Sequence, residues 1–218
     1  MTSQRVPSLL GPVPETILAD LARGIHAAAQ PLAVLQAALS KEHTERMSAE
    51  ELRRLTVSSA FEVQRLCTLF HCLQQLVLAA GQAQLSPMPI LPLLADAVES
   101  VTLLFQNDGI CLSLHMPDAC PVVLMNRSRT LQALSQILLL AHSVSRPRDI
   151  VESIATLSES AVRINIRNQN PSPKQMSTEM SLSMAIAEAN IRSQQAGFCY
   201  RLQPFDVEID LPRALVLH

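Results

Sequence analysis

The stretch that decides the fold is Arg23-Gly-Ile-His26-Ala-Ala-Ala-Gln30-Pro31-Leu32. Around it, apolar side chains recur in alternating steps of four and three residues, the spacing of a single stripe along one side of a helix. The stripe comprises Leu21, Ile25, Ala28, Leu32, Leu35 and Leu39. The pattern predicts an amphipathic helix with Ile25 on its apolar stripe and His26 turned away from it.

The face opposite the stripe carries Arg23, His26, Gln30 and Ala37. Pro31 lies within the helical pattern. Proline removes one backbone hydrogen bond and frees the carbonyl four residues earlier, so a kink just after His26 is expected. The sequence thus places one histidine on the polar face of a helix, five residues before a proline.

A second long helix follows a polar turn at residues 41–47. Ser48-Ala-Glu-Glu51 has the spacing of a capping box, and apolar residues then recur to about Gly81. Two amphipathic helices joined by a short turn predict an antiparallel hairpin. A lone hairpin cannot bury both stripes, so we expect a homodimer with a four-helix bundle.

The second half of the chain has a different pattern of expected helices and strands. Residues 82–92 contain three prolines and predict a connector, which divides the chain into residues 1–84 and 85–218. Beyond it, helices are expected at 91–105, 129–144 and 178–195. Strands are expected at 110–116, 122–125, 150–157, 161–167, 198–203 and 207–211. The order predicts an α+β protein, a helical hairpin followed by a two-layer α/β sandwich.

Composition excludes several classes of protein. The chain has 218 residues, of which 48% are hydrophobic and 17% charged, so it can bury a core. A net charge of -2 argues against general nucleic-acid binding, which needs a basic surface. The five cysteines form no CxxC pair, as expected of reduced thiols in a cytoplasmic protein. No apolar run is long enough to span a bilayer, and the N-terminus lacks a signal-peptide core, so no membrane association is expected.

These features together resemble the core of sensor histidine kinases, in which a dimeric helical hairpin precedes an ATP-binding α/β sandwich. The phosphoacceptor motif of that family is a histidine with proline five residues later and leucine next, as in His26, Pro31 and Leu32. The acidic residue that follows the histidine in the family is replaced by Ala27. The polar residue before the proline, implicated there in phosphatase activity, is Gln30.

The second half resembles the ATP-binding domain in its order of elements but departs from its motifs. Leu140 stands in place of the metal-chelating Asn, and Asn168 and Asn170 replace the Asp and Gly of the adenine site. Ser181-Leu-Ser-Met replaces Gly-Leu-Gly-Leu, and too few residues separate Asn170 from Thr178 for a full lid. Phosphate cradles need glycine, and Mg²⁺ needs oxygen ligands. A degenerate domain without a bound cofactor is therefore expected.

The chemistry left to the chain is that of an imidazole. Neutral histidine, with an ordinary pKa of about 6.5, is a good nucleophile toward phosphorus. Receiver domains bring their own acidic pocket and Mg²⁺, so His26 and a docking surface suffice for phosphoryl transfer. We therefore expect a histidine phosphotransferase of a two-component phosphorelay, with Arg23 steadying phosphoryl oxygens. Its expected partners are response-regulator receiver domains, and a hybrid histidine kinase is a further candidate.

Several alternatives stay open. The same fold can act as a non-catalytic pseudokinase scaffold that binds a receiver or a kinase, with His26 an ordinary surface histidine. An ATP-binding enzyme with an unusual site is a third hypothesis. Gln30 can orient a hydrolytic water or be only a surface side chain. Cys67, His71 and Cys72 have the look of a metal cluster, but apolar neighbours and a missing further ligand favour packing.

Overall fold

The computed structural model describes residues 15–38, 47–79, 81, 83–170 and 177–214. The chain divides into two compact units, Met1–Leu78 and Ala79–His218. This division falls a few residues before the 84/85 boundary drawn from the prolines. The two units are described separately.

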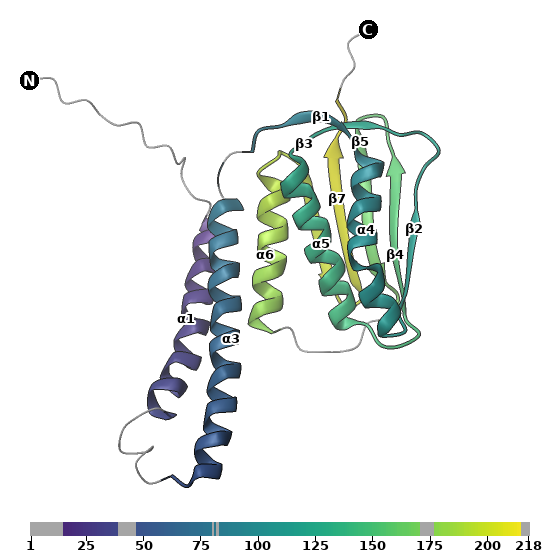
Figure 1. The fold of residues 1–218 in the computed structure, drawn as a ribbon. Helices are drawn as coiled ribbons and strands as arrows, with labels where there is room; N and C mark the ends of the chain where they lie inside the picture. Colours follow the sequence, from purple (N-terminus) through teal and green to yellow (C-terminus); the bar gives the residue numbers. More distant parts are fainter. Residues whose placement is uncertain (1–14, 39–46, 80, 82, 171–176, 215–218) are drawn as a thin grey trace, which may run out of the picture. The chain divides into compact units, whose positions relative to one another are not determined.

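The first unit is the helical hairpin, formed by α1 (Glu15–Ala38) and α3 (Ala49–Ala79), which run side by side in opposite directions (Figure 1). The predicted turn at 41–47 lies almost entirely outside the described residues. The capping box is confirmed. Ser48 N donates to Glu51 Oε2 at 2.8 Å, and Glu51 N donates back to Ser48 Oγ at 3.4 Å. The helix α1 continues through Pro31.

The apolar stripe predicted for α1 is only partly right. Ala28 and Leu35 are buried, but Ile25 is 63% exposed and Leu32 is exposed too. Gly24 and Pro31 are buried instead. The buried face is thus centred one position before the predicted stripe, because a partner helix covers only part of a wide apolar surface. Leu39 lies outside the described residues.

The uncovered part of that surface has a regular spacing on both helices. Residues seven apart lie on one side of a helix, two turns on. On α1 such exposed residues are Leu18, Ile25 and Leu32, and on α3 they are Val63, Phe70 and Val77. We call these two sets the exposed stripes. Each member leaves between 43% and 63% of its surface open to solvent.

The second unit is an α/β sandwich built on a five-stranded sheet with the order β2-β4-β5-β7-β6. Strand β2 runs parallel to β4, and the other neighbours are antiparallel. The strands of this sheet are β2 (Cys111–His115), β4 (Ile150–Leu157), β5 (Ala161–Asn168), β6 (Gly197–Leu202) and β7 (Phe205–Pro212). The helices are α4 (Ile90–Asn107), α5 (Arg127–Val144) and α6 (Thr178–Arg192). The fold class predicted from the sequence is confirmed.

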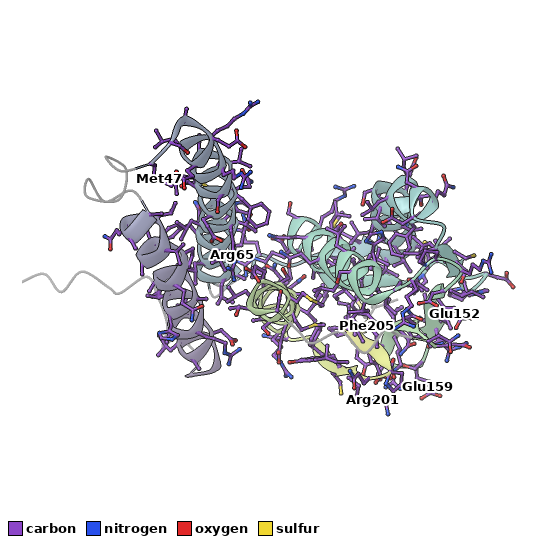
Figure 2. The ribbon with its side chains drawn as sticks, turned by 90° about the horizontal axis from the view of Figure 1, so that it is seen from below. Met47, Arg65, Glu152, Glu159, Arg201 and Phe205 are labelled. Carbon is purple, nitrogen blue, oxygen red and sulfur yellow. The ribbon has the colours of Figure 1, made fainter. Side chains whose placement is uncertain are left out.

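The three helices lie over one face of the sheet (Figure 1). The core lies between these two layers and is almost entirely aliphatic, with Phe105 and Phe205 as its largest fully buried side chains. Figure 2 shows Phe205 on the inside, whereas Glu152 and Arg201 lie at the periphery. Between α4 and β2, Gly109 has a φ of +67°, a conformation that favours glycine.

The predicted connector at residues 82–92 is wrong in part. It contains the strand β1 (Ser86–Pro89), which pairs antiparallel with β3 (Val122–Met125), and α4 already begins at Ile90. The prolines are tolerated because β1 is an edge strand that pairs with β3 on one side only. Proline lacks a backbone N–H, and this costs little in an edge strand. Pro92 lies in the first turn of α4, whose N–H groups have no partner within the helix.

Candidate functional site

His26 lies on the exposed face of α1, away from the side that packs in the hairpin. Gln30, one turn later, and Arg23, one turn earlier, are exposed as well. Arg23 already has a partner within its own helix, because its Nη1 lies 2.9 Å from Oδ1 of Asp20. Both side chains in this pair reach solvent, so the contact is weak and the guanidinium is free to turn toward an incoming anion.

The surroundings of His26 are unusually small side chains. Four exposed alanines lie on the same stretch of α1: Ala22, Ala29, Ala33 and Ala37. Of the other predicted supporting residues, Ala27 is half-buried and Pro31 is buried, so both face the inside of the hairpin. The accessible site therefore consists of His26, Arg23 and Gln30 on a surface that lets another protein approach closely.

Exposure by itself does not single out His26. His71 on α3 and His115 on β2 are also exposed, and His142 on α5 is half-buried. The ring of His142 meets Phe105 edge-on, with centroids 5.0 Å apart, and its Nε2 lies 2.8 Å from Oδ2 of Asp108. What distinguishes His26 is the proline five residues later on the same helix and the alanines beside it.

The second candidate site is the region between α5 and α6 to which the resemblance assigns the nucleotide. Leu140 is buried there and offers no oxygen to a metal ion. A cavity of about 200 Å³ remains, with mostly apolar walls. Its lining residues are Gln136, Leu139, Leu140, Ser143, Glu179, Met180 and Ser183. Ligand pockets commonly measure about 300–1,000 Å³, so this space is small for a nucleoside triphosphate.

Asn168, at the end of β5, is buried and fully engaged with the protein. Its Nδ2 donates to Ser145 Oγ at 2.7 Å and to Asp149 Oδ2 at 3.3 Å. Its Oδ1 accepts from the backbone N–H of Asn170 at 2.9 Å. The side chain at the position of the family's adenine-binding Asp thus holds the surrounding loops together. The expected shortness of the lid concerns residues 171–176, which lie outside the described residues.

The glycine-free helix start is well ordered by other means. Ser177 caps α6, its side chain accepting from Met180 N at 3.2 Å. Ser181 and Ser183, both half-buried, stand where the family's Gly-Leu-Gly-Leu has its two glycines. Side chains therefore occupy the space that a phosphate-binding glycine turn leaves open.

The cysteines on α3 do not form a cluster with His71. Cys67 and His71 are exposed and one turn apart, and Cys72 is half-buried on another side of the helix. Among the residues that the structure describes, no group of three or more His, Cys, Asp or Glu side chains is placed to hold a metal ion.

Within the described ranges, no helix combines the length and the apolarity needed to cross a bilayer.

Sequence reasoning missed two features of these sites. The partners of Asn168, Ser145 and Asp149, lie some twenty residues earlier, and no local pattern links them. The exposed stripe on α3, formed by Val63, Phe70 and Val77, cannot be told by sequence pattern alone from the apolar residues of that helix that pack against α1. Only the packing separates the two stripes.

Comparisons with known proteins agree with this architecture. No model of a known protein family matches the chain, and no curated protein sequence matches it. Among solved structures, the Acinetobacter baumannii histidine kinase AdeS is similar over 88% of this chain and 98% of that chain, with a TM-score of 0.63 and 15% identity. Histidine kinase ThkA, in complex with response regulator protein TrrA, matches 91% of this chain and 63% of that one, with a TM-score of 0.69 and 14% identity.

A histidine kinase from Burkholderia phymatum STM815 is similar over 93% of this chain and 100% of that chain, with a TM-score of 0.52 and 15% identity. At such low identities these likenesses concern the fold. The chain has the histidine kinase fold, a helical hairpin followed by an ATPase-like α/β sandwich, as the sequence predicted.

Proposed function

We propose that this protein is a histidine phosphotransferase of a two-component phosphorelay, which carries a phosphoryl group on His26 between receiver-domain aspartates without using ATP. The observation that carries the proposal is an exposed His26, with Pro31 five residues later, on the hairpin of a histidine kinase fold. The coarser part, a role in two-component signalling, is supported by the kinase structures and the kinase–regulator complex among the similar proteins.

The proposed reaction needs little from the chain beyond His26. The lone pair of the imidazole Nε2 attacks the phosphorus of a receiver's aspartyl phosphate, and the P–O bond to that aspartate breaks, releasing its carboxylate. A second receiver's aspartate then attacks the phosphohistidine, and the P–N bond breaks. Phosphoryl transfer depends on in-line positioning and charge neutralisation. Each receiver supplies Mg²⁺, and Arg23 can add one positive charge.

The surface around His26 suits an approaching protein. The alanines at 22, 29, 33 and 37 leave room for a receiver to bring its aspartate to the ring. Elsewhere on the hairpin, Val34 on α1 and Val57 and Phe61 on α3 are more than half exposed. Apolar side chains of this kind supply the buried area that a transient interface requires. These features support a docking surface for receiver domains.

Three features of the α/β unit support a carrier that does not take its phosphoryl group from ATP. The cavity between α5 and α6 is small, Leu140 cannot hold a metal ion, and Asn168 is engaged with Ser145, Asp149 and Asn170. We therefore infer that the domain is degenerate as a nucleotide-binding unit and that no cofactor is bound.

The exposed stripes support a homodimer. Leu18, Ile25 and Leu32 on α1 and Val63, Phe70 and Val77 on α3 leave large apolar surfaces uncovered within one chain. A second copy of the hairpin would cover them and complete a four-helix bundle. His26 lies on a different side of α1 from Ile25 and would stay accessible in such a dimer.

The direct test uses receiver domains phosphorylated with labelled acetyl phosphate. Label should pass to the wild-type chain as an acid-labile phosphoramidate and on to a second receiver. His26→Ala should abolish this transfer, whereas His71→Ala, which removes another exposed histidine of the hairpin, should leave it unchanged. Transfer that persists in His26→Ala would overturn the proposal.

The second candidate is a non-catalytic scaffold on the same fold. It is favoured by the exposed apolar side chains at Val57 and Phe61, which serve binding equally well without any chemistry at His26. The two candidates differ in one measurement. A scaffold binds a receiver with equal affinity in wild type and His26→Ala and takes up no label in either.

A further inference from the structure

The side chain of Arg129, in the first turn of α5, gathers three oxygens from distant parts of the chain. Its Nη1 donates to the carbonyls of Ala79 at 3.1 Å and Gly81 at 2.6 Å, and to Ser193 Oγ at 2.8 Å. Ala79 and Gly81 precede the first strand of the α/β unit, and Ser193 caps α6. One guanidinium thus joins the entry of the α/β unit to two of its helices.

A second set of hydrogen bonds lies at the same corner. Asn126 caps α5 by accepting from Arg129 N at 3.1 Å, and its Nδ2 donates to the carbonyl of Gln84 at 3.1 Å. The backbone N–H of Asn126 donates to Oε1 of the fully buried Gln194 at 2.6 Å. The chain leading into β1 is therefore held at Ala79, Gly81 and Gln84 by Arg129 and Asn126, which Ser193 and Gln194 contact in turn.

The charge of Arg129 suits this position. Ala79 is the last residue of α3, and the last carbonyls of a helix have no partner within it and carry a partial negative charge. Partial burial lowers the pKa of the Arg129 guanidinium, because desolvation disfavours its charged form. Removing this cation from water costs free energy, which its three short contacts offset.

We propose that Arg129 is a clasp that fixes the entry segment, Ala79 with Gly81 and Gln84, to the α/β unit. The entry segment then moves with the α/β unit as one body. This inference is independent of whether His26 carries a phosphoryl group.

Hydrogen–deuterium exchange of the full chain tests the clasp. In Arg129→Gln, the peptide covering residues 76–85 should exchange about tenfold faster, the effect of losing a hydrogen bond to a charged group. The central strands β5 and β7 should keep their wild-type rates. Arg127→Gln is the matched control, because Arg127 lies two residues away on α5 and its exposed side chain pairs with Asp96 at 2.7 Å. It should leave the 76–85 peptide unchanged.

If Arg129→Gln does not fold, Arg129→Met replaces it, since methionine keeps the apolar stem without burying an unpaired polar group. Wild-type exchange of residues 76–85 in the variant would overturn the proposal. Faster exchange spread evenly over the whole α/β unit would overturn it as well, because Arg129 would then contribute to general stability and would not hold one segment.

Discussion

Asn168 shows how a single residue can satisfy the hydrogen-bonding groups of the pocket around it. Its carboxamide needs both a donor and an acceptor end, because Nδ2 meets Ser145 and Asp149 while Oδ1 accepts from Asn170. An aspartate in the same place could accept from Asn170 N but would have no donor for Asp149. The side chain that differs from the family pattern is therefore the one that this pocket requires.

Placing an aspartate at position 168, as the histidine kinase motif has it, should accordingly destabilise the protein. Asn168→Asp would bring a buried carboxylate within about 3.3 Å of Asp149 Oδ2, the present distance from Nδ2. Like charges and a lost hydrogen bond should lower the free energy of unfolding by about 2 kcal/mol at pH 7, and by less at pH 5 as the new carboxyl is protonated. Urea titrations at the two pH values measure this. Asn170→Asp, at an exposed side chain, should change stability by less than about 0.5 kcal/mol.

At the scale of elements, the sequence was most reliable where a pattern is local. The bounds of β3 and β4 agree with the expected strands, and the capping box at Ser48 begins the second helix as predicted. The sequence-based predictions fail where contacts with distant parts of the chain determine the secondary structure. Strand β1 was missed because its prolines suggest a linker, and only pairing with β3 makes it a strand.

The same distinction between local pattern and tertiary contact holds for the candidate site. His26 and its exposed neighbours Arg23 and Gln30 were recognisable, because position on a helix follows from periodicity alone. The burial of Gly24 and Pro31 in place of Ile25 and Leu32 was not, because both faces are apolar and only the partner helix chooses between them. The contacts of Asn168 and Arg129 join residues far apart in the chain and leave no local signal.

The outer face of the sheet carries charged pairs that link neighbouring strands, and one of them predicts a pH dependence. Asp206 on β7 accepts from Arg201 Nη2 on β6 and from Asn165 Nδ2 on β5, each at 2.7 Å. Burial by itself would raise the pKa of the Asp206 carboxyl, but the hydrogen bonds from Arg201 and Asn165 outweigh it and lower that pKa.

A carboxyl whose pKa is lower in the folded state stabilises the fold above its unfolded value of about 3.9. That contribution should be lost as the pH falls from about 4 through the folded pKa. Asp206→Asn removes it, so the difference in free energy of unfolding between wild type and variant should be constant above pH 5 and shrink below pH 4. Thermal or urea unfolding across this range measures the difference. A gap that stays the same down to pH 2 would contradict the assigned role of Asp206.

At the scale of the whole molecule, the exposed stripes and the site of His26 make separate demands on the hairpin. In the proposed dimer, a second copy covers one surface, and the other stays open to the proposed partners. Phe61 and Phe70 on α3 allow the two surfaces to be tested separately. Both are more than half exposed, but nine residues place them on opposite sides of the helix, and only Phe70 belongs to an exposed stripe.

Phe70→Asp should therefore convert the proposed dimer to a monomer, because it would bury a charge at the centre of the apolar contact. Phe61→Asp should leave the dimer intact, since its side chain faces away from that contact, but should weaken the proposed docking of receiver domains. Sedimentation equilibrium of the two variants and the wild type gives the masses, and receiver binding is measured in parallel.

A wild-type chain that sediments as a monomer, or a Phe70→Asp variant that remains a dimer, would show that the exposed stripes serve another partner. Equal loss of the dimer in both variants would show that the hairpin responds to any added charge and that these two faces have no distinct roles.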